Sequence, residues 1–454
     1  VVASAGLFHT TVGKAPGYVQ VFDMEQVANT PVRTLGDLLS MHAVGSSLGN
    51  HERQGTIHGV RGILVDNGAK TLIMLDGQQI NQRSHFGYMT GLRSPLLGDL
   101  QTVEVINGPG AIQHGSGAIN GFINLLPKTG ATHPGTFARS EFGFAEDLWL
   151  MEAGQGWEYG EGRHLYLYGG AFGAAGFEPD EDWGLDKSYD GDVDAYGFRT
   201  PNYRVSTAWT HDAFDFTAFS QEINTQKNTN QEAGDFHTQS LGLRPRYTFW
   251  ADADESLEVA ASLVMHDHAA ARGGGRELHS EVKTTLRSFR MERHSLAVGA
   301  LAGYKEFDPA KQFFSHDLDS AFESVETEWY EYGLFAEDVM DAPGDVTLSL
   351  GVRYDLYELN PVSGGPNLGP DSFSPEDPDG HVSPRIALAW EASPSLNVKV
   401  SYQHGLRMPD AAYYDWNLAN NRTAESLGIQ GSGPLEPEEM DSVELTLSQS
   451  SSPD

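Results

Sequence analysis

Apolar and polar side chains alternate along most of the chain after residue 136, and this period of two constrains the fold more than any other feature. In one run, Val346, Leu348 and Leu350 alternate with Thr347 and Ser349. Successive side chains of a β-strand point to opposite faces, so the pattern predicts strands that are apolar on one face and polar on the other. A wall of such strands can face lipid on one side and water on the other.

The lengths of the connections between these runs add a second constraint. The alternation predicts about fourteen strands, near residues 136–144, 149–158, 164–174, 203–211, 214–224, 240–251, 257–268, 280–290, 294–307, 326–341, 346–359, 382–392, 396–408 and 440–449. Short connections at 159–163, 212–213, 252–256, 291–293, 342–345 and 393–395 alternate with long ones at 175–202, 225–239, 269–279, 308–325, 360–381 and 409–439. The one exception is 145–148, which is short on the long-loop side. This alternation is typical of barrels in the bacterial outer membrane, and a soluble β-sandwich gives no reason for it.

Composition removes several classes of function. The formal net charge of -34 repels nucleic-acid phosphates, so no nucleic-acid partner is expected. The 454 residues include no cysteine, which excludes disulfides, zinc–thiolate sites and iron–sulfur clusters. The common hydrolase and nucleotide-binding motifs are absent, and echoes of penicillin-recognising enzymes at Lys128 and Ser280 stand in the wrong order. We therefore expect no enzymatic activity.

The first 130 residues follow a different pattern, that of a small α/β unit. Strands are expected at 18–22, 71–75 and 101–106, where short apolar runs are bounded by turn residues. Thr34 and Asp37 form an acidic variant of the helix capping box, so a helix is expected to begin there.

Six short phrases in this unit occur in a fixed order. They are Ala15-Pro16, Thr34 to Leu39, Val60 to Gly62, Leu72 to Gly77, Val103 to Pro109 and Gly115 to Asn124. With them, residues 12–128 resemble the plug domain of TonB-dependent outer-membrane receptors. The resemblance implies a mainly β protein, with an antiparallel transmembrane barrel and the α/β plug in its lumen. It also implies three parts: an N-terminal segment 1–11, a plug 12–130 and a barrel domain 131–454.

The resemblance continues into the barrel and then departs from the family pattern in two ways. Gly351 to Asp355 and Leu435 to Glu438 look like recurrent barrel phrases of the family. Plugged transporters have roughly 22 strands, so about eight are expected beyond the fourteen. Either the chain is a fragment or a second polypeptide completes the wall. The family usually has an arginine at Asn107 that pairs with barrel carboxylates, so that plug latch is missing or relocated, and Arg61 remains as a candidate.

The N-terminal residues resemble the energy-coupling segment of the family, called the TonB box. It consists of Val1, Val2, Ala3, Ser4 and Ala5. β-Branched residues favour extended backbone, which can add as a strand to the sheet edge of a partner protein. The resemblance implies a TonB-type protein of the inner membrane as that partner. The alternative is an ordinary frayed tail.

Two loops of the plug are expected to face outward and contact a small-molecule ligand. The candidate residues are Asn50, Glu52, Arg53, Gln54, Arg83, His85, Phe86 and Tyr88. The alternative is that these loops only pack against the barrel. The sequence does not name the ligand, because receptors for ferric siderophores, haem, cobalamin and glycans share the plug phrases.

Two further groups of side chains have metal-binding chemistry, although no cofactor is required. An acidic loop can supply oxygen ligands for Ca²⁺ from Asp180, Glu181, Asp182, Asp186, Asp190, Asp192 and Asp194. A solvated acidic loop is the alternative. His266 and His268 share one face of a strand, but no third ligand is evident in the sequence, which favours a role without metal.

The resemblance implies energised uptake across the Gram-negative outer membrane, among its lipids. Ligand binding on the plug would expose the N-terminal segment, and pulling on that segment would open a path. A non-transporting plugged barrel that serves as a surface adhesin or assembly scaffold is the alternative.

Overall fold

The computed structural model describes most of the chain. The residues described are 2, 4–51, 55–64, 68–82, 87–88, 91–144, 147–175, 198, 202–229, 232–251, 255–270, 273–289, 291–308, 326–363, 379–409 and 436–449. Among them no helix is long and apolar enough to cross a membrane.

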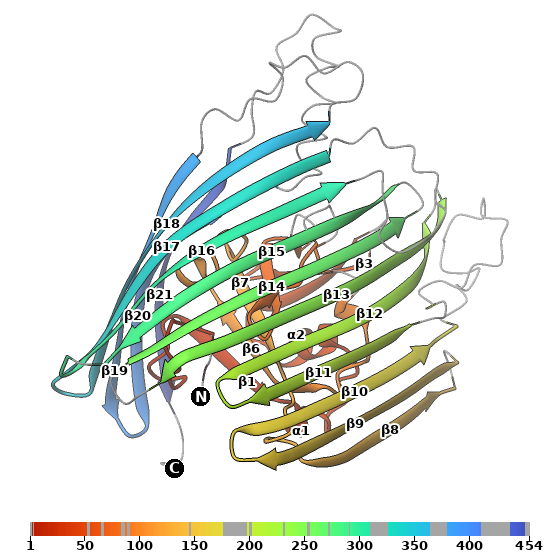
Figure 1. Cartoon of the computed structure of the whole chain (residues 1–454), viewed down its shortest axis with the longest axis horizontal. Coiled ribbons are helices and arrows are strands. Elements are labelled where there is room, and N and C mark those ends of the chain that lie inside the picture. The colour runs from red at the N-terminus through yellow and green to blue at the C-terminus, as the bar shows by residue number, and fades with distance from the viewer. Residues whose placement is uncertain are drawn as a thin grey trace, which may run out of the picture.

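Fourteen strands form one antiparallel sheet in chain order, from β8 to β21 (Figure 1). Their bounds are β8 Gly135–Gly143, β9 Leu148–Gly160, β10 Arg163–Gly173, β11 Tyr203–His211, β12 Phe214–Thr229, β13 Glu232–Ala251, β14 Glu255–Ala270, β15 Gly273–Ser288, β16 His294–Asp308, β17 Glu326–Ala342, β18 Val346–Ser363, β19 Asp379–Ser393, β20 Leu396–Arg407 and β21 Glu438–Gln449. All fourteen predicted strands are present, because alternation marks the two faces of each strand. Two predicted long connections, 225–239 and 269–279, are wrong, because β12 continues to Thr229, β13 begins at Glu232, β14 continues to Ala270 and β15 begins at Gly273. Within the described residues, β8 and β21 each pair with one neighbour, so the curved sheet does not close.

The two faces of this wall differ as the alternation predicts. On β18, Val352 and Tyr354 point outward and are 46% and 44% exposed, whereas Arg353 and Asp355, which alternate with them, are fully buried. The outer face therefore offers apolar side chains to lipid, and the charged residues project into the lumen.

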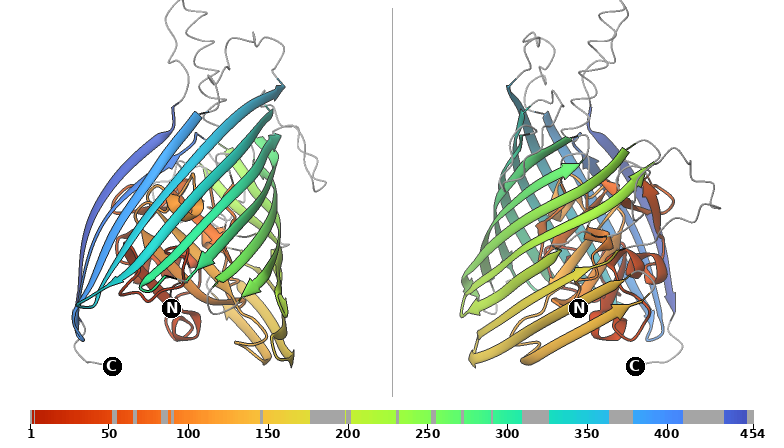
Figure 2. Two further views of the ribbon diagram at one scale, coloured as in Figure 1. Left: turned by 60° about the vertical axis from the view of Figure 1, so that its left-hand side comes forward. Right: turned by 90° about the vertical axis from the view of Figure 1, so that its right-hand side faces the viewer.

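The plug lies inside the curved wall, as the red and orange segments show in both views of Figure 2. Its strands are β1 Tyr18–Asp23, β2 Ser46–His51, β3 Gly55–Val60, β4 Thr71–Leu75, β5 Gln78–Gln79, β6 Leu100–Asn107 and β7 Gly121–Pro127. Five of them form a sheet in the order β1-β6-β7-β4-β5, and β2 and β3 form a separate pair. The helices are α1 Met24–Val27, α2 Leu35–His42, the 3₁₀ turn η2 Gly91–Arg93, and α3 Ala111–His114.

Local sequence signals set the ends of the plug helices. Asp23 accepts a hydrogen bond from the backbone of Glu25 and caps α1. Thr34 and Asp37 form the reciprocal capping box at the start of α2, as predicted. Leucines of α2 pack on apolar residues of the sheet to form the plug's own core, which includes Leu35, Leu38, Leu39, Ile73, Leu75, Val103, Val105, Ile123 and Leu125.

Candidate functional site

The junction between plug and wall is made largely of hydrogen bonds and ion pairs. Asp99 of the plug accepts hydrogen bonds from Arg204 and Ser206 of β11, both at 2.8 Å. On the opposite wall, the Tyr357 hydroxyl accepts the backbone N–H of Ser116 at 3.1 Å. Polar contacts of this kind can be exchanged for water. Phe219 of β12 also packs into the plug's core, so rearrangement of the plug must break this apolar contact as well.

The turn after β4 contacts β13 of the wall next to Pro245. Asp76 accepts from Arg244 of β13 at 2.7 Å, and Gln78 donates to the Leu243 carbonyl oxygen at 2.9 Å. Next to them stands Pro245, which has no N–H for the strand ladder. Burial is the largest single effect and opposes ionisation of Asp76, but Arg244, Arg246 and the Thr217 hydroxyl together outweigh it and lower the pKa of the carboxyl group.

Residues 2 and 4–7 of the N-terminal segment are buried against plug and wall, whereas His9 and Thr11 are exposed. Val2 has no exposed surface and pairs with the backbone of Thr10 through hydrogen bonds of 2.7 and 3.0 Å. The Ser4 backbone and hydroxyl both donate to the buried Glu104 carboxylate of β6. Val1 and Ala3 lie outside the described residues. A strand partner can therefore reach this segment only after it is released.

Two charged residues of the wall hold the chain just after Ser4. Glu337 of β17 accepts the Leu7 N–H at 2.6 Å and is ion-paired with Arg385 of β19. Arg385 in turn donates to the Ala5 carbonyl oxygen at 3.1 Å. Neither side chain was anticipated from the sequence, because no local pattern links positions more than 300 residues apart.

Arg61 is ion-paired with Glu444 of β21, so a plug arginine does meet a barrel carboxylate. Asn107, which replaces the family's arginine, is buried and donates instead to the Val44 carbonyl oxygen at 3.0 Å. This ion pair joins the plug to the last strand of the sheet, and the role of Arg61 as a plug latch stays a prediction.

Most of the predicted ligand contacts cannot be placed. Outside the described residues lie the side chain of Asn50 and the residues Glu52, Arg53, Gln54, Arg83, His85 and Phe86. The Asn50 backbone pairs with Thr56 in the β2–β3 hairpin. Tyr88 packs against the plug core and hydrogen-bonds Gln221 of β12. Ligand contact by these residues stays a prediction.

The acidic loop, with all of its candidate calcium ligands from Asp180 to Asp194, also lies outside the described residues. A different acidic set is described at Glu306, Asp308 and Glu326, whose ligand atoms lie within 4.8 Å of one another. Arg276 contacts Glu306 and Asp308 at 2.9 and 3.6 Å, so a guanidinium already supplies positive charge there.

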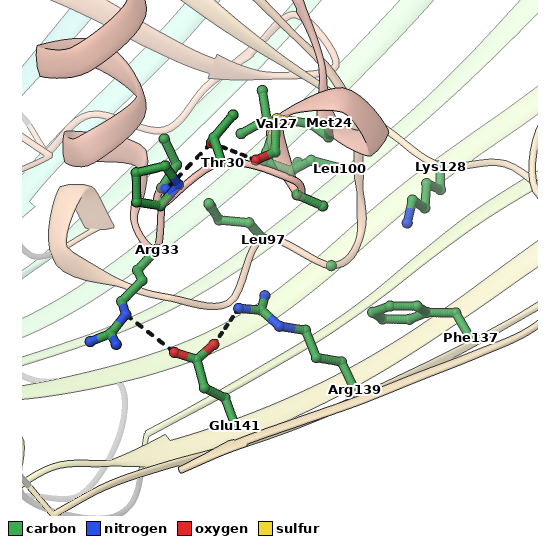
Figure 3. Close-up of a pocket in the computed structure, with 14 residues that line it drawn as sticks. Met24, Val27, Thr30, Arg33, Leu97, Leu100, Lys128, Phe137, Arg139 and Glu141 are labelled. Atoms are coloured by element: carbon green, nitrogen blue, oxygen red, sulfur yellow. Dashed lines mark hydrogen bonds and ion pairs between the residues drawn. The ribbon is translucent and has the colours of Figure 1, made fainter. Parts of the chain in front are cut away.

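A cavity of about 410 Å³ lies between the plug and the first wall strand. Figure 3 shows Arg33 of the plug and Arg139 of β8 both directed at Glu141, with ion pairs of 3.2 and 2.6 Å. Lys128 lies over the ring of Phe137, with 4.7 Å between its nitrogen and the ring centroid. Plug and wall do not close-pack here, and the lining carries more positive than negative side chains.

Comparisons with known proteins agree with this architecture. One curated relative, the probable TonB-dependent siderophore receptor PirA of Acinetobacter baumannii, is 29% identical over 130 residues, which is 25% of this chain and 17% of that protein. The structure of BauA, the ferric preacinetobactin receptor of the same species, has a TM-score of 0.67 and 14% identity over 98% of this chain and 70% of that one. The receptor in the FpvAI–pyocin S2 complex has a TM-score of 0.71 and 15% identity over 98% of this chain and 61% of that one.

Two family models divide the chain between them. Residues 11–122 match the TonB-dependent receptor plug domain, and residues 123–451 match the TonB-dependent receptor-like β-barrel. Proteins of this kind reside in the outer membrane of Gram-negative bacteria, where they act as receptors and transporters and not as enzymes. The chain therefore belongs to the TonB-dependent receptor family.

Proposed function

We propose that this chain forms the gated part of a receptor that imports a scarce small molecule with energy supplied from the inner membrane. The observation that carries the proposal is the N-terminal segment, which is extended at Val2 and held by a few polar contacts at Ser4, Ala5 and Leu7. Such contacts can be broken singly, and the freed backbone can then pair with the edge strand of an inner-membrane partner.

Gating requires that ligand and partner favour a different state of the plug from the one in which the segment is buried. A ligand shifts this equilibrium only by its difference in affinity for the two states. The polar junction between plug and wall supports such a shift, because its ion pairs can be exchanged between partners.

A ferric chelate is the first candidate for the ligand. BauA is a ferric preacinetobactin receptor and PirA a probable siderophore receptor. Haem, cobalamin and glycans are the other candidate classes. Mass spectrometry of the small molecules that co-purify with the receptor would decide among them.

Deletion of Val1 to Ala5 tests the proposal. We expect cells to keep binding a co-purified ligand, or a probe such as ferric citrate or haem, at the surface and to stop accumulating it. Unchanged accumulation would overturn the proposal. Surface adhesion that persists in cells without any uptake by the intact receptor would support a non-transporting barrel instead.

A further inference from the structure

Four ionisable side chains meet on two neighbouring wall strands. This histidine cluster consists of His266 and His268 of β14 with Glu277 and His279 of β15. The register places His266 directly opposite Glu277. All four side chains are at most 6% exposed. The structure thus places Glu277 and His279 beside the histidine pair on β14, where the sequence alone showed no third ligand.

The histidine cluster faces the lumen at the level of the plug. Lys283 lies on the same face of β15 and donates to the Gln113 carbonyl oxygen of the plug at 2.8 Å. On β13, Thr238 lies opposite His268 and is contacted by Gln82 of the plug at 3.5 Å. The side chains are therefore within the gated interior and do not face lipid.

Two pairs of atoms within the histidine cluster are close together. His279 Nε2 lies 3.1 Å from one oxygen of Glu277, and His268 Nδ1 lies 4.0 Å from the other. Nitrogen and oxygen ligands of a tetrahedral zinc ion, bonded at 2.0–2.2 Å, are about 3.3 Å apart. The rings of His266 and His279 are edge to face with centroids 5.7 Å apart. Among the described residues, no three of these four side chains place one ligand atom each within 4.8 Å of one another, so the rings must turn toward a common point for one ion to be held.

His266 has a nitrogen that the fold leaves for a ligand. Its Nδ1 is hydrogen-bonded to the Ser240 hydroxyl of β13 at 2.8 Å, which orients the ring. Nε2 is buried without a hydrogen-bond partner. A buried polar nitrogen left in this way costs free energy unless something binds it. In the tautomer with the proton on Nδ1, Nε2 carries the lone pair that a metal ion needs. An outer hydrogen bond that orients a ring is typical of metal-ligating histidines.

We propose that the histidine cluster binds a divalent transition-metal ion of the zinc class. Imidazole nitrogens with one carboxylate are the ligand set that such ions prefer over Ca²⁺ or Mg²⁺. The near-complete burial of all four side chains favours a bare ion over haem, because a porphyrin ring would need open space beside them.

This site needs neither energised uptake nor a siderophore. The metal can be bound by the purified receptor in detergent, so failure of metal binding and failure of the proposed transport function are separate outcomes.

Titration of the metal-free receptor with Zn²⁺, and with Co²⁺ as a spectroscopic probe, tests the proposal. We expect one tight equivalent and the visible absorption of tetrahedral Co²⁺. His266→Asn should lower the affinity by at least roughly a hundredfold, and Ser240→Ala, which only orients the ring, by about 10–100-fold. The matched control is His294→Asn, because His294 lies elsewhere on β16 and pairs with Asp338 at 3.0 Å.

Each result decides the question. Tight binding that is lost in His266→Asn and kept in His294→Asn supports the site. No tight Zn²⁺ binding by the wild-type receptor, or equal affinity in both variants, overturns it. If His266→Asn does not fold, Glu277→Gln replaces it, with the same expected loss. A receptor that binds hemin and not Zn²⁺ would also contradict the assignment to a bare ion.

Discussion

Release of the N-terminal segment should be governed by one carboxylate of the wall, Glu337. It accepts the Leu7 N–H at 2.6 Å and holds Arg385, which donates to the Ala5 carbonyl oxygen. Hydrogen bonds to charged groups contribute about 1.5–3 kcal/mol each. The neutral amide in Glu337→Gln keeps about half of that. Only the Leu7 bond joins Glu337 to the segment, so the loss is about 1 kcal/mol, which raises the population of the released segment about fivefold.

Cysteine labelling measures this population directly. The chain has no cysteine, so Ala5→Cys provides a single thiol, at a position only 4% exposed. Its maleimide labelling rate should rise about fivefold in Glu337→Gln, because the reagent reacts with the released form. Glu328→Gln is the matched control: it lies on the same strand and accepts from Tyr304 at 2.9 Å, away from the segment. An unchanged labelling rate, or the same increase in both variants, would show that Glu337 does not hold the N-terminal segment.

Three further predictions concern other parts of the molecule. Burial lowers the pKa of His58 from about 6.5 to about 4, so the folded plug resists its protonation and loses up to about 3 kcal/mol of stability as pH falls across that window. The hydrogen-exchange protection factors of the β2–β3 hairpin, taken relative to the intrinsic exchange rate at each pH, should therefore fall from pH 7 to 4, and His58→Asn should remove the effect. If the acidic loop binds calcium, millimolar Ca²⁺ should protect residues 180–194 from proteolysis and Asp190→Asn with Asp192→Asn should abolish the protection, whereas equal cleavage leaves a solvated loop. Because unpaired strand edges are costly in lipid, β8 and β21 should require partner strands. The 454 residues alone should therefore not migrate as a heat-modifiable closed barrel in detergent, and adding about eight C-terminal strands should restore one. A folded, heat-modifiable monomer without the added strands would contradict this prediction.

The wall and the plug elements could be predicted from sequence because their signals are local. Alternation along Val346 to Leu350 reports which face of a strand is apolar, and the Thr34–Asp37 box marks a helix start within one turn. Both depend on neighbours a few residues apart, so no knowledge of the tertiary fold is needed.

The candidate sites depend on register and on how the sheet curves, which no local pattern contains. His266 and His268 were recognised as a pair, but Glu277 and His279 join them only because β14 and β15 pair in one particular register. Likewise, Glu337 reaches the N-terminal segment across the lumen from a strand 330 residues away from Leu7. Shifting either strand by one residue would turn these side chains to the lipid face.

If the N-terminal segment transmits energy to the plug by pairing as a strand, uptake should depend on the backbone N–H of Val2. Val2→Pro removes the backbone N–H that now bonds to Thr10 and that strand pairing with a partner would use. Accumulation of the co-purified ligand should be measured in energised cells, alongside its binding at the cell surface, for wild type, Val2→Pro and the conservative Val2→Ile. We expect the three proteins to bind the ligand normally at the cell surface and only Val2→Pro to lose accumulation. Accumulation by Val2→Pro at the wild-type rate would contradict it.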